Sequence, residues 1–125
     1  MSAADHAHPL DPTLVATARA ALAPLADVEH VVERLGLIAE PTRLRVLQAL
    51  NSVPELCVGD VAFVVGVSDD AASYALRLLR GAGLVRTRRA GRIVYYRLAE
   101  GFPQPLLRHC VGELLRLAAK DGSGG

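Results

Sequence analysis

The chain has 125 residues, of which 51% are hydrophobic and 22% are charged, so it can build one packed domain with little room for a second. No apolar run approaches the roughly 18 residues that span a bilayer, and the N-terminus lacks the cationic start of a secretion signal. The formal net charge is +1, and the two cysteines, Cys57 and Cys110, are too few for a disulfide-rich fold. We therefore expect a cytoplasmic protein without a membrane partner.

The first forty residues predict a flexible arm followed by two helices. Residues 1–10 are small and polar and include two histidines, as is typical of a mobile arm. Asp11 is a good N-cap and Pro12 a good first helical residue, so a helix is expected to begin there and to end at about residue 23. A second helix is predicted over about residues 27–39, where apolar residues repeat on one stripe.

Three further helices are expected before the chain turns to strands. Pro41 disfavours helix at the residue before it, so a new helix begins at this point. A helix over residues 55–65 is predicted to end at Gly66. Ser68 is a good N-cap for a third helix that runs to about residue 80. The residues of the first and third of these helices that are expected to be buried are Leu44, Val46, Leu47, Leu50, Ala72, Leu76 and Leu79.

A β-hairpin and a last helix complete the predicted elements. Residues 84–90 and 92–98 alternate apolar and polar around the turn signal Ala90-Gly91. A helix follows over about residues 105–120, and the glycine-rich residues 121–125 are expected to be disordered. Its broad apolar stripe could pack on its own domain or on a second copy; we favour the second, because a small domain gains buried apolar area by dimerising. The stripe consists of Leu106, Leu107, Cys110, Val111, Leu114 and Leu117.

The order of elements over residues 42–98 indicates a winged helix-turn-helix. This arrangement presents one helix to the DNA major groove and the hairpin to the flanking backbone. Seven arginines and no acidic residue lie between Asp70 and Glu100, which is half of the 14 lysines and arginines of the chain. A local basic field of this kind is typical of a protein that binds a polyanion. The sequence therefore predicts a mainly α-helical domain with a small β-hairpin over residues 11–120, dimeric through its terminal helices, that binds double-stranded DNA.

The helix capped by Ser68 is the expected recognition helix. Ser73 and Arg77 are predicted to face the bases, whereas Arg88 and Arg89 of the wing are predicted to act mainly on backbone phosphates. The residues expected to contact DNA are Ser68, Ser73, Tyr74, Arg77, Arg86, Arg88, Arg89 and Arg92.

The stretch ELCVGDVA, the following VGVSDDAASYALRLLRGAGLV and the wing GRIVYYRL closely resemble the ArsR/SmtB family of bacterial metal-responsive repressors, over about residues 33–118. The resemblance implies a homodimer that occupies its operator when metal-free and leaves it on binding its inducer. The recognition helix departs from the family, which often has a Ser-His-Gln run where this chain has Ser73-Tyr74-Ala75. In addition, this chain has two acidic residues, Asp69 and Asp70, at the end of the helix that is expected to approach phosphates. DNA binding is still expected, with room for a different operator sequence.

The first candidate metal site lies in the ELCVGD sextet. Cys57 and Asp60 are three residues apart at a predicted helix start, so both side chains are expected on one face, and a thiolate with a carboxylate is half of a tetrahedral site. His6 and His8 of the arm are candidates for the other half; in the resembling sensors, the arm of one protomer completes a site with these two positions of the other. The ligand set suits zinc first, and also cadmium, nickel or cobalt.

A second candidate set lies around the last helix. His109 and Glu113 are four residues apart, with Cys110 adjacent and Glu100 upstream. Glu100 matches the first acidic position of the family's dimer-interface zinc site. However, Phe102 replaces its histidine, Glu113 falls where the family has a histidine, and Arg116 falls where it has an acid. This set is therefore expected to be degraded as a zinc site.

Two alternative functions remain open. One is a thiol redox or persulfide sensor that uses Cys57 and Cys110, although related sensors have their second cysteine where this chain has Leu47. The other is a winged helix that recruits protein partners, although such a module need not keep its arginines free of acidic neighbours. No local motif suggests a catalytic triad, a phosphate-binding glycine loop or a carboxylate pair in a cleft, so neither an enzyme nor a small organic substrate is expected.

Overall fold

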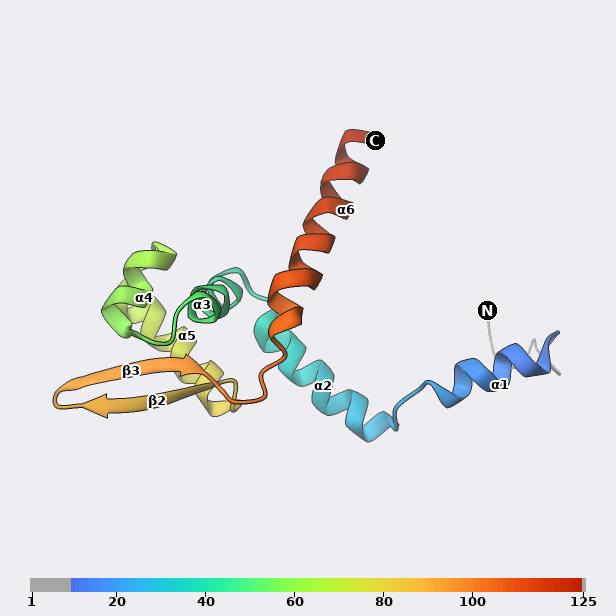
Figure 1. Cartoon of the computed structure of the whole chain (residues 1–125), viewed down its shortest axis with the longest axis horizontal. Coiled ribbons are helices and arrows are strands. Elements are labelled where there is room, and N and C mark those ends of the chain that lie inside the picture. Colours follow the sequence, from blue (N-terminus) through green and yellow to red (C-terminus); the bar gives the residue numbers. More distant parts are fainter. Residues whose placement is uncertain (1–9, 125) are drawn as a thin grey trace. The chain divides into compact units, whose positions relative to one another are not determined.

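The computed structural model describes residues 10–124, with the side chains of residues 10–119, and Figure 1 gives the order of the elements along the chain. The chain divides into two compact units, residues 1–33 and residues 34–125. The predicted arm, with His6 and His8, lies outside the described residues except for Leu10. Among the described residues, no helix is long and apolar enough to cross a membrane.

The first unit contains helix α1 (Pro12–Ala20) and the beginning of helix α2 (Leu25–Ile38). Asp11 caps α1 as predicted, because its carboxylate accepts hydrogen bonds from the backbone N–H groups of Thr13 and Leu14, both at 3.1 Å. Helix α1 ends three residues before the predicted position, and α2 begins two residues early. Every side chain from residue 10 to residue 33 is exposed, so the apolar residues of this unit have no core within one chain.

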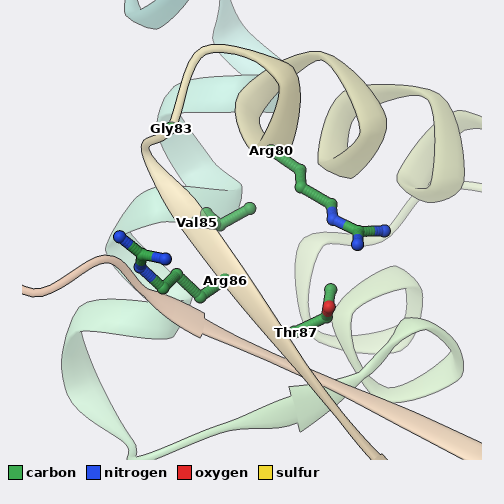
Figure 2. A pocket seen from close by; sticks show the side chains of 5 residues that line it. All are labelled: Arg80, Gly83, Val85, Arg86 and Thr87. Carbon is green, nitrogen blue, oxygen red and sulfur yellow. The ribbon is translucent and has the colours of Figure 1, made fainter.

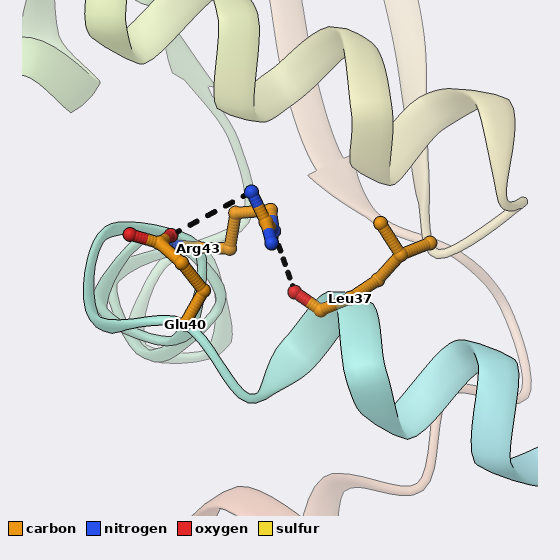
Figure 3. Close-up of polar contacts among 3 residues, drawn as sticks. All are labelled: Leu37, Glu40 and Arg43. Carbon is orange, nitrogen blue, oxygen red and sulfur yellow. Dashed lines mark hydrogen bonds and ion pairs between the residues drawn. The ribbon is translucent and has the colours of Figure 1, made fainter.

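The second unit begins with the end of α2 and helix α3 (Pro41–Ser52), joined at Glu40. Glu40 is the N-cap of α3, and its carboxylate accepts a hydrogen bond of 2.8 Å from the backbone N–H of Arg43. The Arg43 side chain turns back and donates from Nε to the carbonyl oxygen of Leu37 at 2.6 Å (Figure 3). One arginine thereby satisfies a carbonyl at the C-terminal end of α2, which has no partner within its own helix.

Helices α4 (Val58–Val65) and α5 (Asp69–Gly81) form the helix-turn-helix. Gly66 ends α4 with a φ of 78°, a left-handed conformation that glycine adopts without steric cost, and its N–H donates to the carbonyl of Ala62. Ser68 then caps α5, because its hydroxyl oxygen accepts a hydrogen bond of 3.1 Å from the N–H of Ala71. The predicted turn and cap are confirmed, and they fix where the recognition helix starts.

The wing is a three-stranded antiparallel sheet rather than the predicted two-stranded hairpin. Strands β2 (Val85–Ala90) and β3 (Ile93–Leu98) form the expected hairpin, and the short strand β1 (Leu56–Cys57) pairs with β3, giving the order β1-β3-β2. The prediction of a helix from residue 55 was therefore wrong for its first three residues. Backbone pairing with a strand about forty residues away extends this segment, and a local sequence pattern does not carry that information.

The hydrophobic core joins α3, α4, α5 and the base of the wing. Ala72, Leu76 and Leu79 of α5 are fully buried, as predicted, and Leu44 of α3 is only partly buried. Leu107, from the C-terminal segment, is 5% exposed and belongs to the same cluster. The other buried members are Val46, Leu47, Leu50, Val61, Ala62, Val65, Ala75, Leu84 and Val85.

The C-terminal segment differs from the continuous α-helix that we predicted over residues 105–120. It begins with a π-helical turn, η2 (Leu106–Cys110), and continues as α6 (Val111–Gly124). Helix α6 thus covers residues expected to be disordered, because helix propagation adds one hydrogen bond per residue and can override the low propensity of glycine and serine. Leu107 is buried and Leu106 and Val111 are half-buried, whereas Cys110, Leu114 and Leu117 are exposed, so half of the predicted apolar stripe is left exposed by its own domain.

Candidate nucleic-acid interface and metal ligands

The recognition helix α5 presents Tyr74 and Arg77 to solvent. The Tyr74 side chain is 54% exposed, and the Arg77 guanidinium lies 5.9 Å from the centre of its ring, within the range of a cation–π contact. Ser73 is half-buried, and Asp70 in the first turn is exposed. The helix therefore offers one arginine and one aromatic hydroxyl to a groove, with the acidic residue beside the N-terminus, where the helix dipole favours it.

The end of α5 and the start of the wing enclose an open cavity of 370 Å³. Figure 2 shows Arg80 of α5 and Thr87 of β2 on one side of the strand, whereas the Arg86 guanidinium extends to the other side. This placement follows from the two-residue alternation of side chains along a strand. The residues that line the cavity include Arg80, Arg86 and Thr87, whose side chains carry donors that suit a phosphate oxygen.

The wing carries its cations on both faces of strand β2. Because side chains alternate, Arg86 and Arg88 lie on one face and Arg89 on the other, and Arg92 lies in the turn after Gly91. All four are exposed. Among the described residues, no acidic side chain forms an ion pair with Arg86, Arg89 or Arg92, nor with Arg77 and Arg80 of α5.

Arg88 has a partner that the sequence analysis missed. Its guanidinium donates from Nε to Glu55 Oε2 at 3.1 Å and from Nη2 to Glu55 Oε1. This bidentate hydrogen bond lowers the pKa of Glu55 and raises the pKa of Arg88, since each charge stabilises the other. The segment between Asp70 and Glu100 contains no acidic residue. In the fold, however, Glu55, which is 33 residues upstream of Arg88, lies beside this arginine. The antiparallel pairing of β1 with β3 brings the two together.

The structure places Cys57 at the N-cap of α4 and not within a helix. Its backbone is extended, with φ −80° and ψ 166°, and its side chain is half-buried and makes no capping hydrogen bond. Asp60 lies in the first turn of the same helix and is exposed. These residues supply a thiol and a carboxylate at one helix end, and the remaining candidates for this site, His6 and His8, lie outside the described residues.

The second candidate set is not assembled in the structure. Within the described residues, no three His, Cys, Asp or Glu side chains lie together in a way that could hold a metal ion. Glu100 lies 3.8 Å from Arg97, and Glu113 forms an ion pair with Arg116, so both carboxylates of the set have arginine partners. His109 and Cys110 are exposed on η2. The expectation that this set is degraded as a zinc site stays a prediction.

A capped helix after a tight turn, a three-stranded wing and exposed arginines on both define a winged helix-turn-helix protein. Residues 40–87 match the family described as bacterial regulatory protein, arsR family. The chain is 41% identical over 90 residues to the transcriptional repressor SmtB homolog of Synechocystis sp., which covers 72% of this chain and 67% of that protein. The chain belongs to the ArsR family of transcription regulators, and its fold and relatives indicate a DNA-binding regulator and not an enzyme.

Two further comparisons support this assignment. The cadmium resistance transcriptional regulatory protein CadC homolog of Staphylococcus aureus is 39% identical over 72 residues, or 58% of this chain, which spans 57% of that relative's length. The solved homodimeric winged helix-turn-helix domain of Mb0332 from Mycobacterium bovis, a possible ArsR-family regulator, has a TM-score of 0.60 and 28% identity. That match covers 78% of this chain and 85% of the other.

Proposed function

We propose that this protein is a metal-responsive transcriptional repressor that binds operator DNA as a homodimer and is released when a transition metal ion binds. The observation that carries the proposal is the combination of exposed arginines on α5 and the wing with a thiol and carboxylate at the start of α4, within the ELCVGD sextet. As a regulator of bacterial genes it would act in the cytoplasm.

DNA binding is supported by the placement of the arginines. Arg77 on α5 is positioned for base edges of a major groove, and Arg89 and Arg92 on the wing for flanking phosphates. Ser68 fixes the start of α5, and Ser73 and Tyr74 complete the face presented to DNA. Arg88 differs from the other wing arginines, because it already has a carboxylate partner.

Dimerisation is supported by apolar side chains left exposed on two helices. Val31 and Val32 of α2 are 53% and 58% exposed, and Leu114 and Leu117 of α6 are 64% and 56% exposed. A monomer that leaves such patches in water is unusual, and covering them in a second copy removes that cost. A two-fold dimer also presents two recognition helices to a two-fold operator.

The proposed metal ligands are Cys57 and Asp60, completed by His6 and His8. A half-buried thiol that makes no capping hydrogen bond and an exposed carboxylate at one helix start fit the donor set of a borderline metal such as zinc, and also of cadmium, nickel or cobalt. When bound, such an ion would link the segment that carries His6 and His8 to the start of α4. The chain's own residues would then favour a different arrangement of α4 from the one that binds DNA, a coupling of about 1–3 kcal/mol.

The test is titration of zinc, cadmium, nickel and cobalt chlorides against the protein bound to the promoter fragment of its own gene. We expect wild type to leave the DNA with at least one of these ions, with a loss of affinity of about 5- to 150-fold. Cys57→Ser should keep DNA binding and lose the metal response, and His6→Ala with His8→Ala should show a milder defect. Cys110→Ser separates the two candidate sets, since it should respond to metal normally if Cys57 is the ligand. A Cys57→Ser protein that is released normally would contradict the assignment, and a Cys57–Cys110 cross-link under oxidant would favour a thiol sensor.

A further inference from the structure

Glu55 is not among the residues that sequence or family assigns to DNA or metal, yet it forms a bidentate contact with an arginine of the wing. Both of its carboxylate oxygens accept hydrogen bonds from Arg88, and the Glu55 side chain is only 26% exposed. Arg88 also lies over the ring of Tyr95, with its guanidinium carbon 4.8 Å from the ring centre. The guanidinium is therefore held from two directions.

The sheet register explains why these groups meet. Tyr95 of β3 is directly opposite Arg88 of β2 on one side and Cys57 of β1 on the other. Directly opposed residues of antiparallel strands have side chains on the same face of the sheet, so Cys57, Tyr95 and Arg88 form one row across it. Glu55 precedes Cys57 by two residues and reaches the same face. A wing cation is thus tied to the segment that leads into α4.

A bidentate carboxylate competes directly with a DNA phosphate for this guanidinium. The planar fork of arginine matches carboxylate and phosphate equally well, and an arginine already neutralised by Glu55 adds little to counterion release from DNA. The carboxylate also places a negative charge beside the wing, where DNA phosphates would approach. By contrast, Arg89 and Arg92 have no acidic partner among the described residues and are available to DNA directly.

We propose that Glu55 is an internal counter-ion of the wing that withholds Arg88 from DNA phosphates and so weakens sequence-independent binding. This inference rests on the proposed DNA-binding function of the wing. Glu55 acts through Arg88 and touches no DNA itself, so it is a positioning residue. Its effect is to favour operators, where base contacts add to the remaining phosphate contacts, over DNA in general.

The test uses Glu55→Gln, which removes the charge and keeps the shape of the side chain. Binding of the full chain to sonicated mixed-sequence genomic DNA is measured by fluorescence anisotropy over a series of salt concentrations. Freeing Arg88 for one more phosphate should steepen the slope of log K against log salt by about 0.9, which is roughly a 3.5-fold larger loss of affinity for a fourfold rise in salt. Glu29→Gln is the matched control, because it changes the net charge identically on α2, outside the winged unit.

A double-mutant cycle distinguishes release of Arg88 from a general electrostatic effect. Arg88→Gln alone should keep the wild-type salt slope, but the Glu55 carboxylate left without its partner should lower the affinity, and adding Glu55→Gln should restore the affinity without steepening the slope. An unchanged slope in Glu55→Gln, weaker binding in that variant, or an equal steepening of the slope in the Arg88→Gln background would each overturn the proposal. Wild type that binds neither this DNA nor its promoter would instead refute the proposed function.

A second measurement is made on the wild-type protein, and a variant serves only to assign one resonance. The Nε–H resonance of Arg88 in the wild-type protein, assigned by its loss in Arg88→Gln or Arg88→Lys, should be protected from solvent exchange in the free protein because it donates to Glu55. Addition of the genomic DNA should leave it protected and unshifted, since the proposal has Arg88 withheld. The proposal would be contradicted if this resonance exchanged freely with solvent in the absence of DNA. It would also be contradicted if the resonance shifted when DNA was added, as expected for a contact with a phosphate.

Discussion

At the scale of single residues, Glu40 and Arg43 control how the second unit begins. The Glu40 carboxylate caps α3 by accepting from the N–H of Arg43, and the Arg43 side chain donates to the Leu37 carbonyl at the end of α2 (Figure 3). The hydrogen bond from the backbone of Arg43 is the main cause that lowers the pKa of Glu40. Two side chains therefore satisfy backbone groups on both sides of the Glu40-Pro41 junction.

This arrangement predicts a pH-dependent stability difference for Glu40→Gln. The pKa of Glu40 is lowered in the folded state, so its carboxylate stabilises the fold above the unfolded pKa, and this contribution is lost as pH falls through the folded pKa. Thermal unfolding followed by circular dichroism should show Glu40→Gln melting a few degrees below wild type at neutral pH, with the gap closing in acid. If the difference in melting temperature were the same at neutral and at acid pH, the loss of stability in Glu40→Gln would not come from the charge of Glu40. Glu29→Gln is the control, and its difference in melting temperature from wild type should not change with pH in this way.

At the scale of elements, we expect the recognition helix and the wing to contribute differently to DNA binding. Helix α5 is fixed by the Ser68 cap and carries Arg77 beside Tyr74, whereas the wing carries arginines on both faces of β2. A helix in the major groove can read base edges, and a strand hairpin beside the backbone meets phosphates. The two elements should therefore fail in different ways when an arginine is removed.

Arg89→Gln and Arg77→Ala test this division. Arg89→Gln should weaken binding to all duplexes alike and reduce the salt slope by about 0.9, because one phosphate contact is lost. Arg77→Ala should cost about 1–3 kcal/mol on the operator and less on unrelated DNA, because a base contact is lost. Both are measured by anisotropy on the promoter fragment and on a scrambled duplex, with Arg108→Gln of η2 as the charge control. Equal losses on both duplexes for Arg77→Ala would assign that residue to phosphates.

At the scale of the whole molecule, apolar side chains are exposed on several elements, whereas the core of the winged unit is closed. Val31 and Val32 of α2 and Leu114 and Leu117 of α6 are among them, as is Phe63 of α4. The proposed homodimer would cover the faces of α2 and α6, because a second copy supplies the same faces by symmetry.

Replacing Leu114 and Leu117 together by glutamate should therefore give a monomer. Sedimentation equilibrium should report half the mass of wild type, and affinity for a two-fold operator should fall steeply, because the second half-site is no longer held by the same complex. Phe63→Glu on α4 is the matched control, since Phe63 is apolar and 88% exposed but lies on another helix. If Phe63→Glu gave the monomer and the α6 variant did not, the interface would lie on α4.

Elements whose ends depend on local chemistry could be predicted from the sequence. Asp11, Glu40 and Ser68 cap helices where their side chains can accept from the next turn, and Gly66 and Gly91 turn where a positive φ is required. The spacing of apolar residues likewise identified the buried face of α5. These features depend on residues within one or two turns of each other, so a local pattern contains them.

The contacts between residues far apart in the sequence could not be predicted in this way. The ELCVGD sextet resembles a helix start, but pairing with β3 makes Leu56 and Cys57 a strand and turns Glu55 toward Arg88. An arginine that the sequence assigns to DNA thereby gains a carboxylate partner. Strand pairing and ion pairs between residues tens of positions apart depend on how the chain packs around its core. A pattern of residues adjacent in sequence does not contain this information.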